Sequence, residues 1–548
     1  MLLETRVLTC LDKVFYDEAP LEADPCLQGF ENERMEFQVA FRASDVRWEA
    51  VEMEIHSSLA DHIKVRQVRQ VPVQYAVPED AREDCLRTRP GLYPDLLTEL
   101  KPHALHASPR WSCLWFTVEP GEGLTPGVYP IEIAFRDGEG TLYPVRDIRA
   151  EVLPGLLPPQ TLIHTKWFHC DCLSQYYHVE VFSEEHWRLI ENFMRAAVRG
   201  GINMILMPVH TPPLDTRPGG SRRTVQLVDI AADGDGYHFD MSRVRRWIAL
   251  CRKCGVEYYE IAHLFSQWGA AHAPRIMATV NGEARPIFGW DTDAAGEEYG
   301  RFLRAYIPAL RACFREEGME DRAYWHISDE PHQAHLESYA AARRQVEGLL
   351  AGCHMMDALS DFEFYRRGLV ATPIPGNNHI QPFLDAGVQG LWTYYCCSQT
   401  HKVSNMFIAF PSYRNRVLGV QLFKYGIAGF LQWGYNFYNS HLSDYPIDPY
   451  LTTDAEGWVP AGDPFQVYPG PDGMPEESIR MAVTFQALQD LRAMERLAAL
   501  AGKDFVTGLI DRGLDAPVTF EAYPRSKEYL LSLRKRINEE IVKRERKT

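Results

Sequence analysis

Two adjacent acids, Asp329 and Glu330, are the residues of this sequence best suited to proton chemistry. They follow an apolar stretch and precede Pro331, in the segment 325–331 (WHISDEP). Two neighbouring carboxyl groups repel each other when both are ionised, and partial burial adds to that cost, so one of them should hold its proton unusually well. The pattern predicts a poised general acid. The structural alternative is a helix start, with Asp329 as its cap and Pro331 in its first turn.

Further polar and aromatic residues follow other predicted strands. In an α/β barrel the reactive groups lie at the carboxyl ends of the strands. The candidates there are His169, Asp171, Asp357 and Asn377, and we take six more as candidate substrate-binding residues: His210, His263, Tyr394, Tyr395, Trp433 and Asn436. Sugars present hydroxyls to planar polar groups and C–H faces to aromatic rings, so this set suits a carbohydrate. For each residue singly, the alternative is a buried polar group that serves the structure.

The sequence lacks the signatures of metal, nucleotide or serine-nucleophile chemistry. There is no HExxH helix motif, and the first barrel strand ends in His169-Cys170-Asp171 rather than the His-x-His of barrel metallohydrolases. No Gly-x-Gly-x-x-Gly follows a predicted strand, and no Gly-x-Ser-x-Gly elbow occurs. We therefore expect no metal ion and no cofactor.

The elements that must position these residues form a repeated pattern between residues 157 and 515. A typical unit is the helix that begins after Ser183 and stops at Gly200, which strand 202–207 follows at once. Comparable junctions place eight strands at 161–168, 202–207, 256–261, 323–327, 354–358, 369–371, 391–395 and 430–433. Eight strand-helix units over about 300 residues predict an α/β fold of the (β/α)8 TIM-barrel type.

Residues 1–156 show a different pattern. Short alternating segments, such as 35–41 and 51–55, are separated by polar and glycine turns, which predicts an antiparallel β-sandwich. The boundary lies at 153–159 (LPGLLPP), where prolines remove backbone donors and stiffen the chain. The expected parts are an N-terminal β-sandwich domain at 1–156, the catalytic barrel at 157–515 with a closing helix at 475–501, and a C-terminal helical extension at 516–548.

The composition limits the partners and the compartment. The chain has 57 Lys and Arg against 74 Asp and Glu, a net charge of −17, which argues against a nucleic-acid partner. No stretch approaches the roughly 20 apolar residues of a membrane span, and the N-terminus resembles no secretory signal. The 12 scattered cysteines are typical of reduced thiols. We expect a cytoplasmic protein with no membrane partner and a carbohydrate as its substrate.

The adjacency of Asp329 and Glu330 restricts the mechanism on such a substrate. A glycosidase usually places two carboxyl groups on either side of the scissile bond, about 5 Å apart for retention and about 6.5 to 9.5 Å for inversion. Consecutive residues of one strand cannot easily flank a sugar in this way. They can act from one side, where Glu330 reaches the glycosidic oxygen and Asp329 holds a 2-acetamido group that attacks the anomeric carbon. This is substrate-assisted catalysis.

The sequence resembles glycoside hydrolase family 123 and an overlapping family of uncharacterised proteins with the same catalytic region. The resemblance covers most of the chain. It rests on five groups of residues: GLYPD at 91–95, SDEP at 328–331, LWTYYCC at 391–397 with Asn405 and Arg416, GFLQW at 429–433 with Asn436, and YPG at 468–470 leading to SIR at 478–480.

This resemblance implies a β-sandwich followed by a (β/α)8 barrel, and a retaining exo-β-N-acetylgalactosaminidase that uses the acetamido-assisted route. Asp329 matches the aspartate that orients the acetamido group, Glu330 matches the general acid/base, and Trp433 matches an aromatic residue of the sugar pocket. After Arg480 the family often continues with a glutamate and an Arg-Asp-Gly run, whereas this sequence has Ala482, Phe485, Gln486 and Ala487. The sugar specificity therefore stays open.

Two alternatives remain from the residues alone. The first is a glycosidase for another sugar, in which Glu330 works with a distant carboxylate such as Asp357 or Asp444. The second is a carbohydrate-binding protein on a barrel that has lost its activity. The intact pair of acids favours an enzyme, because a binding protein gains nothing from two costly neighbouring carboxyl groups.

Overall fold

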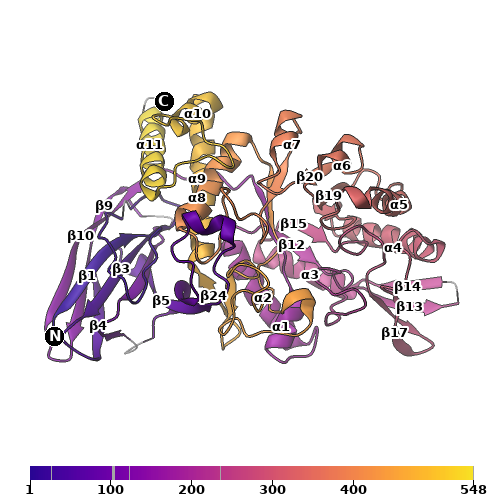
Figure 1. Cartoon of the computed structure of the whole chain (residues 1–548), viewed down its shortest axis with the longest axis horizontal. Helices are drawn as coiled ribbons and strands as arrows, with labels where there is room; N and C mark the ends of the chain where they lie inside the picture. The colour runs from indigo at the N-terminus through magenta and orange to yellow at the C-terminus, as the bar shows by residue number, and fades with distance from the viewer. Residues whose placement is uncertain (26, 102–104, 122–123, 235, 547–548) are drawn as a thin grey trace.

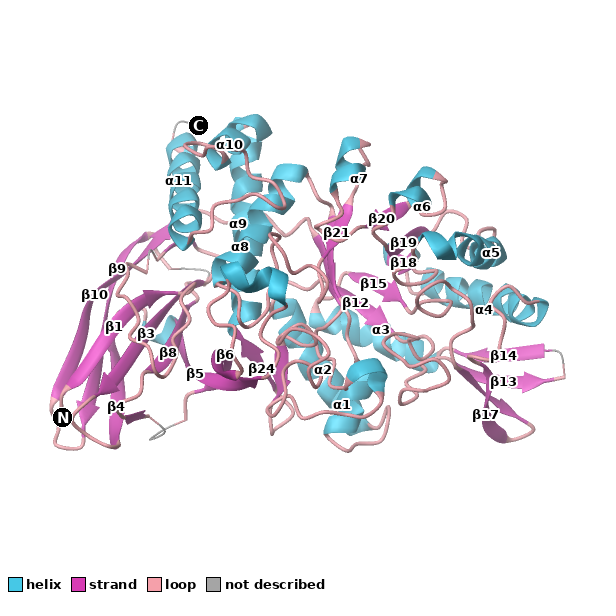
Figure 2. Cartoon of the chain, viewed as in Figure 1, coloured by secondary structure: helices cyan, strands magenta, loops and turns pink. Residues whose placement is uncertain are grey.

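The protein consists of two antiparallel sheets beside a helix-surrounded parallel sheet, seen on opposite sides of Figure 1. The computed structural model describes residues 1–25, 27–101, 105–121, 124–234 and 236–546. The strands at the N-terminal side and the barrel at the other side are bridged by the long helices of the C-terminal third of the chain (Figures 1 and 2).

The predicted N-terminal β-sandwich is confirmed. Its first sheet has seven strands in the order β1 (Leu3–Thr9), β3 (Met35–Ala43), β8 (Ser112–Val118), β5 (Ile63–Val73), β6 (Gly91–Glu99), β24 (Pro475–Ser478) and β23 (Val467–Pro469). Its second has β2 (Gln28–Phe30), β10 (Leu142–Leu153), β9 (Gly127–Asp137), β4 (Glu49–His56) and β7 (His106–Ala107). Alternate residues of β3, such as Phe37 and Phe41, face the core, where Phe41 lies 4.9 Å from Phe135 of the other sheet.

The predicted barrel is also confirmed. Eight parallel strands follow one another round a ring: β11 (Ile163–Lys166), β12 (Met204–Met207), β15 (Tyr258–Ile261), β18 (Ala323–Trp325), β19 (His354–Ala358), β20 (Thr372–Ile374), β21 (Trp392–Tyr394) and β22 (Gly429–Gln432). β22 pairs with β11. Between β20 and β21 the ring is closed by a single parallel bridge, in which Asn377 N–H donates to the Tyr394 carbonyl at 2.9 Å.

The position of the sixth strand differs from the prediction. We expected it at 369–371, but β20 spans Thr372–Ile374. Residues 369–371 instead leave helix α6 (Phe362–Arg366), since Gly368 has a φ of 67° and the Leu369 N–H bonds back to the Phe364 carbonyl at 2.9 Å. This backbone turn ends the helix, and the strand therefore begins later in the sequence than expected.

Helices cover the outside of the ring. α2 (Glu184–Arg199) begins at Ser183, whose hydroxyl accepts from His186 N–H at 3.3 Å, as its sequence predicts. The remaining main helices are α3 (Ser242–Cys254), α4 (Glu297–Glu316), α5 (Leu336–Val346), α7 (Gln381–Asp385) and α8 (Ser412–Tyr425). A small sheet that we did not predict projects beside α4, formed by β13 (Asp229–Asp233), β14 (Gly236–Asp240), β16 (Ile276–Val280) and β17 (Glu283–Phe288).

The predicted closing helix starts later than expected. Residues 475–478 form strand β24 of the first sheet, and helix α9 (Ile479–Ala501) begins after Ser478, which accepts from Met481 N–H at 3.2 Å. The chain continues through α10 (Lys503–Ile510) to α11 (Lys527–Glu545), close to the predicted final helix.

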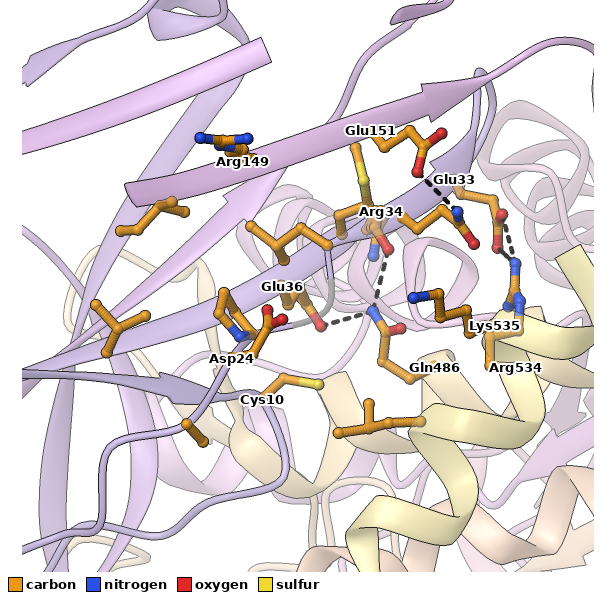
Figure 3. Close-up of a pocket in the computed structure, with 18 of the residues that line it drawn as sticks. Cys10, Asp24, Glu33, Arg34, Glu36, Arg149, Glu151, Gln486, Arg534 and Lys535 are labelled. Atoms are coloured by element: carbon orange, nitrogen blue, oxygen red, sulfur yellow. Dashed lines mark hydrogen bonds and ion pairs between the residues drawn. The ribbon is translucent and has the colours of Figure 1, made fainter. Parts of the chain in front are cut away.

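The barrel and the sandwich are joined by buried polar contacts. The Asp95 carboxyl of β6 accepts twice from Arg480 of α9, at 2.9 Å each. Figure 3 shows a second group, around a pocket between the sandwich and α11, where Arg534 pairs with Glu33 at 2.6 Å. Both ion pairs link residues that are hundreds of positions apart, so the two parts of the chain form one structural unit.

Candidate active site

Asp329 and Glu330 lie just beyond β18, at the carboxyl end of the fourth barrel strand. Strand β18 ends at Trp325, and the next helical turn begins only at Gln333. The pair is therefore no helix start, and the structural alternative drawn from the sequence is wrong. Both residues line one pocket at the end of the ring where the strands finish.

Hydrogen bonds hold both the side chain and the backbone carbonyl of Asp329. Its side chain accepts from the amide of Gln267 at 2.8 Å, and its carbonyl accepts from Trp268 N–H at 2.9 Å. Only 5% of Asp329 is exposed. Because one carboxyl oxygen is occupied by Gln267, the group has a fixed orientation toward the pocket before any ligand binds.

Glu330 is fixed by its backbone and by one tyrosine. Its N–H donates to the Ala358 carbonyl at the end of β19 at 2.9 Å, and Tyr394 donates its hydroxyl to the Glu330 carboxyl at 2.6 Å. Glu330 has a φ of 43°, and Asp215 and Trp268, which line the same pocket, have values of 44° and 53°. Left-handed backbone at residues other than glycine is costly and clusters at functional sites.

The two carboxyl groups resist ionisation, as the sequence predicts. Burial, reinforced by the charge of Glu330, raises the pKa of Asp329 well above its ordinary value, against the opposing effect of Gln267. Burial also raises the pKa of Glu330, and the hydrogen bond from Tyr394 counteracts part of this shift. The pair therefore keeps a proton at a pH where an exposed pair would have lost both.

Aromatic side chains form the other walls of the pocket. Trp433, at the end of β22, lies against Trp458, and its indole N–H donates to Asp463 at 2.7 Å. The full lining comprises Trp167, Asp215, Gln267, Trp268, Asp329, Glu330, Ala358, Tyr394, Cys396, Cys397, Leu431, Trp433 and Trp458. Several indole rings beside a pair of acids make a site that can hold the apolar face of a sugar and donate a proton to it.

A buried charge network lies beneath the pair. The His326 ring is 2.8 Å from a Glu260 oxygen and 3.2 Å from an Asp357 oxygen. Burial alone would lower the pKa of His326, but hydrogen bonds and the charges of Asp357 and Glu260 raise it to about 9. Asp357 also accepts from the N–H groups of Ile327 and Ser328, at 2.9 and 3.3 Å. The network thus fixes the backbone that leads to Asp329.

The structure brings two of the six predicted substrate-binding residues to the pocket and leaves four outside its lining. Tyr394 and Trp433 line it. His210 and His263 are fully buried, and the His210 ring bonds to the His263 carbonyl at 2.8 Å. His263 itself stacks on His326 with ring centres 4.1 Å apart. Both histidines therefore pack behind the charge network.

Tyr395 and Asn436 also lie outside the pocket lining. Tyr395 is fully buried against Phe430, with ring centres 4.8 Å apart. Asn436 accepts from His169 N–H at 2.8 Å and donates to the His169 carbonyl at 3.1 Å, so its amide is used in joining β22 to the loop after β11. Successive residues of a strand point to opposite sides, which accounts for the separation of Tyr394 from Tyr395.

The distant carboxylates that we considered as partners of Glu330 do not line the pocket. Asp357 lies in the buried network, and Asp444 is paired with Arg217 at the surface, with an oxygen 2.8 Å from the guanidinium. Asp215 and Gln267, on the loops after β12 and β15, are pocket residues that were not predicted from the sequence. Neither loop has a periodic pattern that would have singled them out.

The described residues also bear on metals and membranes. Among them, no three or more His, Cys, Asp or Glu side chains gather as a metal ion would need. Of the helices in the described part of the chain, none is long and apolar enough to cross a membrane.

The pocket carboxyls should lower the stability of the fold as the pH rises. Burial, opposed by Arg222 and reinforced by Glu330, raises the pKa of Asp215 from 3.8 to about 7. Between these values the folded protein holds a proton that the unfolded chain has released, so the free energy of unfolding falls with increasing pH. Asp215→Asn removes this titration and should stabilise the protein by up to about 4 kcal/mol above neutral pH.

Thermal unfolding of the parent and the Asp215→Asn variant across this range checks the prediction. The difference in Tm should be near zero at about pH 4 and should grow until about pH 8. A difference that does not change with pH would show that Asp215 ionises in the folded protein as it does in the unfolded chain.

Comparison with known proteins agrees with this geometry. The model of the glycoside hydrolase 123 catalytic domain matches residues 167–497, which is more than half of the chain and includes seven of the eight barrel strands, from β12 to β22. No curated protein sequence matches the chain.

Among solved structures, a family 123 glycoside hydrolase from Clostridium perfringens aligns with 100% of this chain and 99% of its own, at 15% identity and a TM-score of 0.76. That likeness shows the fold. The Bacteroides ovatus GH5 xyloglucanase aligns at 8% identity over 84% of this chain and 97% of its own, and the Thermobacillus composti GH10 xylanase at 10% over 60% and 97%. Their TM-scores of 0.32 and 0.29 carry no argument. From the family match, the chain belongs to glycoside hydrolase family 123 and is a glycoside hydrolase of the β-N-acetylhexosaminidase type.

Proposed function

We propose that the protein is a retaining exo-β-N-acetylgalactosaminidase in which the substrate's own 2-acetamido group is the nucleophile. The proposal rests on one observation: Asp329 and Glu330 both line the same pocket, and both follow the carboxyl end of the same strand, β18. Two acids so placed act on a sugar from the same side, which fits a mechanism where the second reacting group belongs to the substrate.

The first step breaks the glycosidic bond. The acetamido oxygen attacks the anomeric carbon and forms a cyclic oxazolinium ion, while Glu330 transfers its proton to the departing oxygen. Asp329 accepts a hydrogen bond from the acetamido N–H and stabilises the positive charge that develops there. In the second step Glu330 takes a proton from water, which opens the ring with net retention.

Substrate binding also places the proton correctly. In the free protein both carboxyls have raised pKa values, and Asp329 is the more deeply buried of the two. An acetamido N–H that donates to Asp329 favours its ionised form, since hydrogen bonding to a carboxylate lowers its pKa. The shared proton then resides on Glu330, where the leaving group needs it. A substrate without the acetamido group gives no such shift.

The natural substrate is proposed to be a glycan or glycoside with a terminal β-linked 2-acetamido sugar. The Clostridium perfringens enzyme of similar fold is described in terms of glycolipid glycan hydrolysis, which makes glycolipid glycans the first substrates to try.

A panel of chromogenic aryl β-glycosides tests the proposed function. We expect hydrolysis of the N-acetylgalactosaminide, a slower reaction with the N-acetylglucosaminide, and near inertness of the plain galactoside and glucoside. Chelation should leave the rates unchanged, because the mechanism uses no metal. Efficient hydrolysis of the plain glycosides would contradict the proposal, and binding of sugars without any hydrolysis would indicate a carbohydrate-binding protein.

A further inference from the structure

Asp215 is a pocket residue that the proposed mechanism does not use. It lies on the loop after β12, where its N–H donates to the Gln267 side chain at 2.6 Å and its carbonyl accepts from the Ser443 hydroxyl at 2.6 Å. Gln267 in turn donates to Asp329. Gln267 therefore fixes both the backbone of Asp215 and the carboxyl of Asp329, and it holds the two residues at fixed positions relative to each other.

The carboxyl of Asp215 differs from the other buried acids around the pocket. Asp329 accepts from Gln267, Glu330 from Tyr394, and Asp463 from the indole of Trp433. For the Asp215 carboxyl, no hydrogen-bond donor is found among the described residues, although only 7% of the residue is exposed.

The nearby cation does not supply that donor. Arg222 donates to both oxygens of Asp171, at 2.9 Å each, and its other hydrogen bonds reach His169, the Leu214 carbonyl and the Cys172 Sγ rather than Asp215. The Asp215 oxygens are not among the fully buried side-chain atoms that lack a partner, so they reach the open space of the pocket that the residue lines. These oxygens are therefore free to accept from a ligand in the pocket.

We propose that Asp215 binds ring hydroxyls of the terminal sugar and thereby selects neutral sugars whose hydroxyls are unsubstituted. The inference rests on the proposed function only in taking a sugar as the ligand. Hydroxyls are donors that match a carboxyl, and a carboxylate oxygen pair can accept from two neighbouring hydroxyls. Anionic sugars are disfavoured, because Asp215 adds a third acid to a pocket that already holds Asp329 and Glu330.

A set of deoxy substrates tests this role. We expect Asp215→Asn to lower kcat/KM for the fully hydroxylated aryl glycoside by about 10- to 100-fold, as loss of a hydrogen bond to a charged group does. For the 3-, 4- or 6-deoxy analogue that lacks the contacted hydroxyl, the parent should already be slow. There the substitution should cost less than about 3-fold, because the interaction is already absent.

Asp444→Asn is the matched control, since Asp444 is an exposed aspartate held by Arg217 and lies outside the pocket lining. It should leave every rate unchanged. Asparagine suits position 215, because it tolerates the left-handed backbone found there and has nearly the same shape as aspartate. Equal losses for Asp215→Asn on all three deoxy analogues and on the parent substrate would overturn the inference.

The outcome is separable from that of the proposed function. If the enzyme cleaves plain β-glycosides instead of 2-acetamido sugars, the proposed function fails, but the deoxy series can be run on those substrates and still tests Asp215. If azide restores activity to an Asp215→Ala variant and yields a glycosyl azide, Asp215 is a nucleophile and the hydroxyl-binding role is overturned.

Discussion

Replacing Glu330 with glutamine is expected to slow the hydrolysis of substrates with poor leaving groups by about 10²- to 10⁴-fold, the usual value of general-acid assistance. Aryl glycosides with good leaving groups need little protonation and should lose much less. Steady-state rates for a series of leaving groups of increasing pKa measure this, since the slope of log kcat/KM against leaving-group pKa should steepen in the variant.

Glu337→Gln is a suitable control for this series. Glu337 is an exposed residue in the first turn of α5, a few positions after the pair, and lies outside the pocket lining. Its substitution should not change the slope. Equal losses by Glu330→Gln on good and poor leaving groups would mean that Glu330 acts in some way other than as an acid.

Asp329→Asn is expected to reduce kcat on the order of 10²- to 10³-fold while KM changes little. The interaction of Asp329 with the acetamido nitrogen strengthens as positive charge develops, so its loss is felt in the transition state more than in the bound substrate. A thiazoline mimic of the cyclic intermediate should inhibit the parent enzyme and bind the variant much more weakly, because it presents a protonatable nitrogen to residue 329.

For Asp329→Asn, the loss of kcat and the weaker binding of the thiazoline must occur together. Asparagine removes an acid whose pKa burial has already raised, so the variant should remain folded at neutral pH, which its melting curve checks. If plain β-galactosides are hydrolysed well and the thiazoline has no effect on the parent, a protein carboxylate is the nucleophile.

Much of the fold could be predicted because its signals are local. Short stretches of sequence predict the serine cap and the glycine end of α2. They also predict the apolar strands that follow helices ending at glycine. Strand β24 was missed although its hairpin with β23, across residues 470–474, is local. Its other pairing, of Glu477 and Ser478 with Leu97 and Leu96 of β6, joins residues far apart in the chain and could not have been predicted from a local pattern. The small sheet beside α4 is a different case, because β16 and β17 pair as a local hairpin across Asn281-Gly282, a turn signal from which it could have been predicted.

The two acids of the site could be predicted from the sequence, whereas most of the other pocket residues could not. Asp329 and Glu330 are adjacent in sequence, so their repulsion is visible without the fold. Position at a strand end did not separate pocket residues from core residues, as His263 and Trp433 show. Strand alternation could have separated Tyr394 from Tyr395. Asp215 and Gln267 meet only through loop conformation, which tertiary contacts decide.

Three of the five groups of family residues supply pocket residues, and the other two serve the structure. Asp95, Tyr468 and Arg480 belong to three of the quoted segments, and they meet in one buried cluster between barrel and sandwich. The departure after Arg480 lies on α9, where Gln486 donates to Glu36 of the sandwich at 2.9 Å, outside the pocket lining. Gln486 therefore acts at the contact between the two parts of the chain.

The pairing of β24 with β6 has a consequence during biosynthesis. Arg480 is 385 positions after Asp95, so at roughly 5 to 20 residues per second the ribosome needs on the order of 20 to 80 s to supply the missing strand and its arginine. Throughout that interval the nascent sandwich has an unpaired β6 edge and an unmatched buried aspartate. Open edges recruit other chains. The β6 edge is therefore the part of the nascent sandwich open to pairing with another chain until β24 has been synthesised.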